Sequence, residues 1–286
     1  MTNVLFDTPG PKARVRYRGL AVLGALIILA IIAYVVWRFY DSGQFAGRKW
    51  DWLQYQQVQE DLVSALLATL RAFALGAVLA LAFGAVFAAG RLSDHAWVRG
   101  ISVAIVELFR AIPLLVLMFL FYYGLPALGV KMTPYLAVVL GLTLYNGSVL
   151  AEVFRAGILA LPRGQSEAAY ALGMRKTQVM FSVLIPQAVR SMLPTIVSQL
   201  VVLLKDTALG FLVTYPELLY YARAISTQGA FGRPSVPSTI VVAAIYIVLC
   251  LLLTALATYL EKRQRRSKKH LPPAAEKGEP ALEPVL

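Results

Sequence analysis

The stretch TIVVAAIYIVLCLLLTALATYL, residues 239–260, contains no charged side chain and is long enough to cross a bilayer as one helix. Comparable apolar runs recur along the chain, which is 59% hydrophobic and has a mean hydropathy of +0.68. Soluble domains are usually only about 45–50% apolar. The runs are continuous rather than alternating, so they indicate spanning helices and not a β-barrel. The expected fold class is therefore all-α, a polytopic helical membrane protein.

Six transmembrane helices are predicted, and Pro113 interrupts the third of them. The spans are residues 20–37, 62–89, 101–125, 135–156, 186–204 and 239–260. Between the last two spans, residues 205–238 combine short apolar stretches with prolines, and we expect a partly helical external region. The domain plan is a cytoplasmic segment 1–19, an additional N-terminal helix 20–40, a core 60–260, and a basic, disordered tail 261–286.

The distribution of basic residues predicts the orientation of these spans. The net charge is +12, and bases precede the first span and follow the last one. Lys and Arg mark cytoplasmic flanks, so both termini are predicted to be cytoplasmic, which requires an even number of spans. The same rule places residues 91–99 and 155–176 in the cytoplasm. Bases at membrane flanks favour contact with lipid headgroups over nucleic acid, which we exclude as a partner.

A polar segment separates the fourth span from the fifth and has the composition of a short helix. It reads GQSEAAYALG, residues 164–173, and continues to VLIP, residues 183–186. Ser166 is expected to cap this helix and Glu167 to favour its first turn. Gly173 permits a sharp turn into a second short helix, Lys176–Leu184, after which Pro186 would open the fifth span. The whole segment, about 164–184, is predicted to face the cytoplasm.

This segment resembles the "EAA" coupling motif in membrane subunits of bacterial ATP-binding cassette importers. Other segments resemble the polar amino acid permeases of that class: ELFR at 107–110 with PLL at 113–115, EVFRAG at 152–157, IPQA at 185–188 and LKDT at 204–207. The resemblance covers roughly residues 60–260. It implies a five-span core, separate ATPase subunits that use the ATP, a second permease subunit (the same or a sister chain) and an extracytoplasmic amino acid-binding protein.

Three departures distinguish the chain from the usual pattern of that branch. Ala111-Ile112 replaces the usual Gly-Thr before Pro113, residues 145–148 replace a more Ala-rich stretch, and the span 20–37 is additional. The combination most resembles glutamate permease subunits of actinobacteria. The expected function is thus that of a permease subunit in an ATP-driven, binding-protein-dependent amino acid importer of a bacterial cell membrane. The resemblance implies glutamate as its substrate.

Candidate site residues fall into three predicted groups. The resemblance implies contact with the ATPase at Gly164, Gln165, Glu167, Ala168, Ala169 and Gly173. Residues proposed for the substrate path are Arg110, Pro113, Asn146, Ser148 and Glu152. Gating or ion-pair candidates are Glu107, Arg155, Lys205 and Asp206. Charges within spans are costly, and the pairs 107/110 and 152/155 each share a helix face, so a purely structural role for them is an open alternative.

Two other functional classes were weighed against the importer. An ion-coupled secondary amino acid transporter should show inverted repeats and isolated intramembrane carboxylates, and neither pattern is evident. A membrane enzyme is disfavoured because no catalytic constellation stands out. The sequence has no phosphate-binding Gly-x4-Gly-Lys-Ser/Thr loop, so no ATPase site, bound cofactor or metal centre is expected. The lone Cys250 lies in an apolar run and is expected to be a small hydrophobe.

Overall fold

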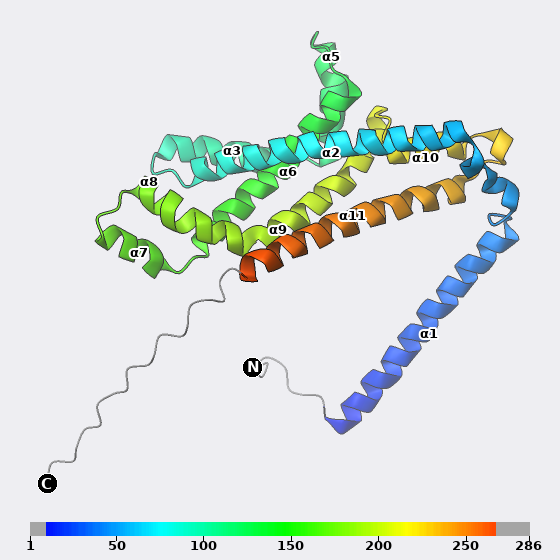
Figure 1. Cartoon of the computed structure of the whole chain (residues 1–286), viewed down its shortest axis with the longest axis horizontal. Helices are drawn as coiled ribbons and strands as arrows, with labels where there is room; N and C mark the ends of the chain where they lie inside the picture. The colour runs from blue at the N-terminus through cyan, green and yellow to red at the C-terminus, as the bar shows by residue number, and fades with distance from the viewer. Residues whose placement is uncertain (1–9, 267–286) are drawn as a thin grey trace. The chain divides into compact units, whose positions relative to one another are not determined.

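The computed structural model describes residues 10–266, with side chains to residue 259, and the regular structure of this part of the chain is helical, with no strand (Figure 1). The expected all-α fold class is confirmed. The α-helices are α1 Pro11–Asp41, α2 Gln56–Arg91, α3 Ala96–Ala111, α4 Leu114–Phe119, α5 Leu125–Ala127, α6 Pro134–Leu159, α7 Arg163–Ala171, α8 Lys176–Gln178, α9 Ile185–Asp206, α10 Leu218–Ser226 and α11 Ser235–Arg266. Most of the predicted tail 261–286 lies outside the described residues.

Five helical segments of the described region are long and apolar enough to cross a membrane, and the bent pair of α3 with α4–α5 makes a sixth candidate. This agrees with the predicted six spans. The bend, 97°, occurs at Ile112 and Pro113, as expected from the proline. Ile112 is extended because the proline ring disfavours helical backbone in the residue before it.

Two π-helical segments, η3 Leu120–Gly124 and η4 Val179–Leu184, each lie just before a proline. A proline within a helix lacks an N–H and clashes with the carbonyl four residues earlier, and a wider turn relieves that conflict. As a result, Pro186 does not begin a new span. The prediction of a separate helix Lys176–Leu184 was wrong, because α8, η4, α9 and the 3₁₀ segment η5 Thr207–Val213 form one span, Lys176–Val213.

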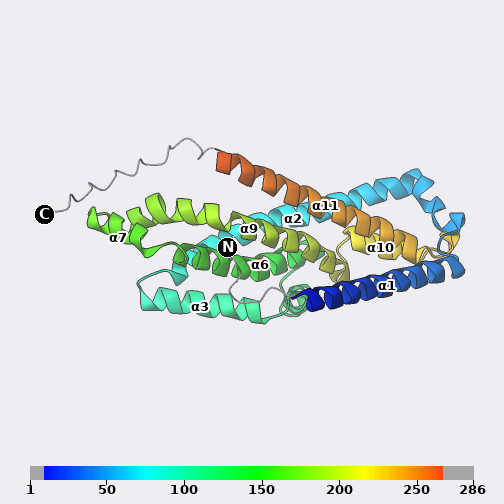
Figure 2. The ribbon, with the colours of Figure 1, turned by 90° about the horizontal axis from the view of Figure 1, so that it is seen from below.

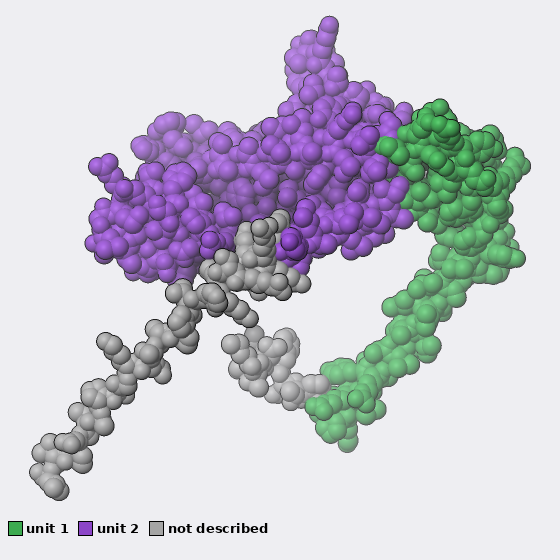
Figure 3. Space-filling view, viewed as in Figure 1, with its two compact units in different colours: residues 1–63, 221–242 green, residues 64–220, 243–286 purple. Residues whose placement is uncertain are grey.

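The chain divides into two compact units (Figure 3). The larger unit comprises residues 64–220 and 243–286. Its core is formed by α2, α4, α6 and α9, and Figures 1 and 2 show α6 and α9 side by side. Small residues permit close helix packing there: a Cβ on Gly84 would lie 2.9 Å from the Leu150 Cβ, and one on Gly147 2.9 Å from the Phe83 ring.

The smaller unit comprises residues 1–63 and 221–242. It contains α1, the 3₁₀ helices η1 Gly47–Lys49, η2 Asp51–Gln54 and η6 Gly229–Phe231, and parts of α2, α10 and α11. Its core is built around buried Trp52, Val58 and Ile225. The Tyr221 hydroxyl donates to the Val58 carbonyl at 2.9 Å, so this tyrosine ties α10 to α2.

A buried carboxylate, Glu217, organises the start of α10. Its oxygens accept hydrogen bonds from the backbone N–H of Leu219 and of Tyr220, each at 2.7 Å, and from the Tyr246 hydroxyl at 2.8 Å. Glu217 has no exposed surface, and this burial raises its pKa to about 7. Nearby Tyr215 is also buried, and its hydroxyl donates to the Ala68 carbonyl at 2.7 Å.

Glu217→Gln is expected to remove a pH dependence from stability. A folded-state pKa raised from 4.5 to about 7 supplies stability that is complete below the unfolded value and is lost as pH rises through 7. The wild-type chain should therefore lose roughly 3 kcal/mol between pH 4.5 and 8 through this group. The apparent melting temperature in detergent, compared across pH for the variant and for the exposed control Glu60→Gln, measures this. Equal slopes in all three proteins would contradict it.

Candidate functional site

The helix α7 lies at one end of the bundle, in the connection between α6 and the span that contains α9 (Figure 1). It starts after Pro162, which is its N-cap residue. Ser166 is not the cap, contrary to the prediction. It lies inside the helix, and its hydroxyl donates to the Arg163 carbonyl at 2.8 Å, because proline already provides the extended backbone that opens the helix.

The end of α7 depends on Gly173, as the sequence indicated. Gly173 has a φ of +77°, which is favourable only without a Cβ. Its N–H donates to the Tyr170 carbonyl at 2.9 Å, and the Met174 N–H donates to the Ala169 carbonyl at 3.2 Å. These two bonds satisfy carbonyls that a helix end leaves open. The turn directs the chain straight into α8.

The side chains of α7 present an outer face of small and apolar groups. Leu172 is 83% exposed and Tyr170 49%, while Ala169 is buried at 5%. The other residues expected at an ATPase contact are exposed: Gly164, Gln165, Glu167 and Ala168. In the described part of the chain Glu167 forms no ion pair, so its carboxylate is available to a partner.

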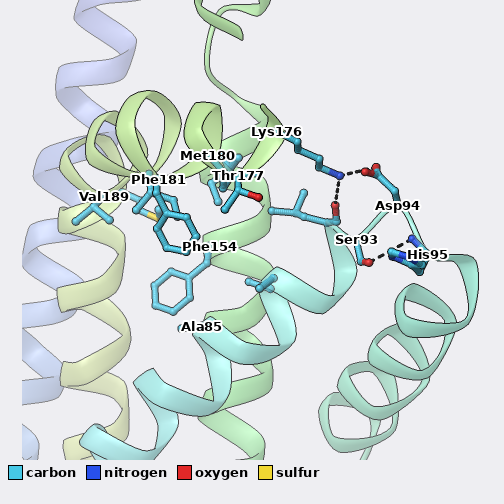
Figure 4. Close-up of a pocket in the computed structure, with 16 residues that line it drawn as sticks. Ala85, Ser93, Asp94, His95, Phe154, Lys176, Thr177, Met180, Phe181 and Val189 are labelled. Carbon is cyan, nitrogen blue, oxygen red and sulfur yellow. Dashed lines mark hydrogen bonds and ion pairs between the residues drawn. The ribbon is translucent and has the colours of Figure 1, made fainter. Parts of the chain in front are cut away.

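Two polar contacts attach this region to the bundle. The Gln187 amide donates to the Gln165 side-chain oxygen at 3.3 Å, which links α7 to α9. Lys176 pairs with the Asp94 carboxylate and donates to the Leu92 carbonyl at 3.2 Å, which links α8 to the connection between α2 and α3 (Figure 4). The hydrogen bond from Lys176 holds the pKa of Asp94 below its usual value. Neither contact was evident from the sequence.

Four candidate residues meet in one ionic cluster around Arg91. The Arg91 guanidinium lies 3.2 Å from Glu107 and 3.1 Å from Glu152. Arg110 reaches Glu107 at 3.4 Å, and the Arg155 Nε donates to Glu152 at 3.2 Å. The Arg91 side chain is only 10% exposed. This cluster joins α2, α3 and α6 and contains three guanidinium groups against two carboxylates.

The remaining candidates lie elsewhere in the larger unit. Asn146 is fully buried; its amide donates to Asp206 at 3.2 Å and accepts from Gln199 at 2.7 Å. Ser148 is also buried, and its hydroxyl has no partner among the described residues. Lys205 is exposed and forms no ion pair with Asp206 in the described chain. Pro113 is exposed at the bend between α3 and α4.

Sequence reasoning missed two residues that complete these groups, Arg91 and Gln199. Arg91 belongs to the stretch 91–99 that the charge distribution places outside the spans, and Gln199 is one of several polar residues in the fifth span. The polar character of Gln199 inside a span was the one available signal, because such side chains usually face other protein groups. Arg91 pairs with Glu107 and Glu152, which are 16 and 61 residues away in the sequence, so no local sequence pattern reveals these contacts.

Arg91→Gln is expected to destabilise the fold by roughly 1–3 kcal/mol, because two carboxylates would lose their shared cation in a partly buried site. The control Arg38→Gln breaks an exposed pair with Asp41, whose side chains are 54% and 53% exposed, and should cost less than about 1 kcal/mol. Apparent melting temperatures in detergent would compare them. Equal losses would contradict a central role for Arg91.

Comparisons with known proteins identify the family of this chain. Residues 80–266 match the family described as "Binding-protein-dependent transport system inner membrane component". The chain is 39% identical to the glutamate transport system permease protein GluD of Corynebacterium glutamicum, over 80% of this chain and 85% of that protein. It is 34% identical to the probable glutamine ABC transporter permease protein GlnP of Bacillus subtilis, over 71% of this chain and 93% of that protein.

A solved structure of an amino acid ABC transporter, determined with histidines, superposes with a TM-score of 0.67 at 30% identity. The superposed region covers 74% of this chain and 98% of the chain in the solved structure. The inward-facing MetNI methionine transporter, at 21% identity and a TM-score of 0.59, shares the fold. The chain therefore belongs to the binding-protein-dependent transport system inner membrane components, as a permease of the polar amino acid ATP-binding cassette class.

Proposed function

We propose that this chain is the permease subunit through which a binding-protein-dependent importer moves glutamate into a bacterial cell, driven by a separate ATPase that docks on α7. The observation that carries the proposal is the exposed helix α7, held between two spans by a turn at each end. The glutamate assignment is supported by the name of the relative GluD.

The α7 face suits a protein partner better than lipid or water. Leu172 and Tyr170 supply exposed apolar area beside the short side chains of Ala168 and Gly164. Short side chains let a partner approach the backbone, and Glu167 offers a charge at the rim of the contact. An exposed apolar group rimmed by polar residues is typical of an interaction site.

A continuous helical path links that face to the interior. The Gln165–Gln187 hydrogen bond joins α7 to α9, and the span Lys176–Val213 carries the chain from the turn at Gly173 to Asp206. A displacement of α7 would therefore also shift the buried, hydrogen-bonded group formed by Asn146, Gln199 and Asp206. In this account, closure of the ATPase subunits pushes α7, and the spans around that group change the side to which the path opens.

The substrate path is proposed along the polar residues of α3 and α6. An amino acid needs acceptors for its ammonium and donors for its carboxylate, and the Asn146 amide and the unpartnered Ser148 hydroxyl offer both. Arg110 belongs to a cluster with one more cation than anion, which suits the side-chain carboxylate of glutamate. Pro113 lies three residues after Arg110, and Glu152 belongs to the same ionic cluster, so both are included in the proposed path. The residues proposed to gate this path are Arg155, Glu107, Lys205 and Asp206.

The complete transporter would include further subunits. We propose two ATPase subunits, a second permease subunit of the same or a sister chain, and an extracytoplasmic binding protein that delivers the amino acid. The basic flanks favour an orientation in which α7 and both termini face the cytoplasm and contact anionic lipid headgroups. Substrate selection would then be shared between the binding protein and the permease path.

Leu172→Arg is expected to prevent association with the ATPase while leaving the chain inserted in the membrane. A charge in the centre of the apolar contact would be desolvated without a partner, and such substitutions cost about 2 kcal/mol or more. Leu128→Arg is the matched control, since Leu128 is 79% exposed but lies between α5 and α6. Co-purification of the ATPase from detergent measures the effect. Normal recovery with Leu172→Arg would contradict docking on α7.

Uptake of labelled L-glutamate into proteoliposomes with the ATPase and binding protein tests the function itself. Uptake should require ATP and should survive collapse of the ion gradients. Arg110→Gln should lower glutamate uptake more than glutamine uptake, because it removes a cation that only the acidic side chain uses. Uptake that persists without ATP but stops when the gradients collapse would instead support an ion-coupled secondary transporter.

A further inference from the structure

An apolar pocket of about 470 Å³ separates two elements of the larger unit near α7 (Figure 4). One wall is the end of α2, with Ala85 and Ala88. The opposite wall is η4 with the start of α9, including Phe181 and Met192. Phe154 of α6 lies at its base, and Figure 4 shows the aromatic rings of Phe154 and Phe181 facing the same space.

The same two helices contribute to one buried core farther along the bundle. Ala72 of α2 and Leu203 of α9 belong to one buried core, and a Cβ on Gly76 would lie 3.8 Å from Leu203. The α2 and α9 helices therefore share a core at one level and line the pocket at its other side, nearer to α7. Relative movement of α9 and α2 at that end would change the pocket without disrupting the core.

Lys176 bridges this opening. Its ammonium group pairs with Asp94 and donates to the Leu92 carbonyl, so one side chain from α8 holds the connection between α2 and α3 by two contacts. Among the described residues, no other hydrogen bond or ion pair joins that connection to α8. Figure 4 shows both contacts at the polar rim of the pocket.

The pair is too exposed to matter chiefly for stability. The Lys176 side chain is 41% exposed and that of Asp94 76%, and ion pairs at such exposure contribute little to folding. The position of the two residues points to a role in connecting α7 with the end of α2. Lys176 is the third residue after Gly173, which ends α7, and Asp94 is the third residue after Arg91, which joins α2 to α3 and α6.

We propose that Lys176 is a positioning residue of the transport cycle, which passes the displacement of α7 across the pocket to the connection between α2 and α3. This rests on the proposed function, since α7 must first be moved by the ATPase. The span Lys176–Val213 then carries one part of the displacement to the interior. The contact of Lys176 with Asp94 and Leu92 carries another part to the end of α2, beside the Arg91 cluster.

The test uses the assembled transporter in proteoliposomes and compares uptake with ATP hydrolysis. Lys176→Met keeps the length of the side chain and removes its charge. It should lower uptake about fivefold or more while ATPase association and hydrolysis stay near wild type, so that more ATP is used per substrate. Lys131→Met, an exposed lysine between α5 and α6, is the matched control and should behave as wild type.

Three further variants separate this role from a folding defect. Asp94→Asn should reproduce the loss, Lys176→Arg should retain transport, and the exchange of both charges, Lys176→Asp with Asp94→Lys, should recover part of the uptake lost by either change alone. Wild-type uptake per ATP in Lys176→Met would overturn the proposal, as would a loss accompanied by equal loss of ATPase association. Failure of the wild-type assembly to couple uptake to ATP would instead contradict the proposed function.

Discussion

The bridge from Arg91 to Glu107 and Glu152 is the interaction on which the α7 end of the larger unit depends. Unpaired charged side chains are costly within spans, so the helices that carry Glu107 and Glu152 must keep these groups paired. One guanidinium satisfies carboxylates from two helices, and this fixes α2, α3 and α6 relative to one another. The connection before α7 leaves from the end of α6, so the position of α7 follows from that arrangement.

The second constraint is the proline at position 186. Had it begun a new span, a flexible joint would separate α7 from the interior. The π-helical segment Val179–Leu184 instead accommodates the proline within a continuous path from Lys176 to Val213. The turn at Gly173 is thus the last sharp change of direction between α7 and the buried residues Asn146 and Asp206. An ATPase pushing on α7 would act on one continuous helical path, which contains Pro194 in its interior.

The sequence was sufficient to predict the fold class, the six candidate spans, the break at Pro113 and the turn at Gly173, because each depends on local composition or on one backbone preference. Two predictions were wrong, the Ser166 cap and the span boundary at Pro186. Pro162 opens α7 in place of Ser166, and the π-helical segment Val179–Leu184 accommodates Pro186 without ending the helix. The roles of Arg91, Lys176, Gln199 and Glu217 escaped prediction, because each depends on partners from distant helices. The substrate residues among the candidates stay predictions.

The claim that α7 is the ATPase contact, on the cytoplasmic side, is tested most directly by cysteine cross-linking in native membranes. The variant Glu167→Cys, combined with Cys250→Ala so that position 167 carries the only thiol of the chain, would be treated with a short thiol-to-amine cross-linker in the presence of the ATPase. In parallel, a membrane-impermeant thiol label would be applied to intact cells. The account predicts a cross-link to the ATPase and no labelling from outside. Labelling in intact cells, or the absence of any cross-link from a chain that still transports, would contradict it.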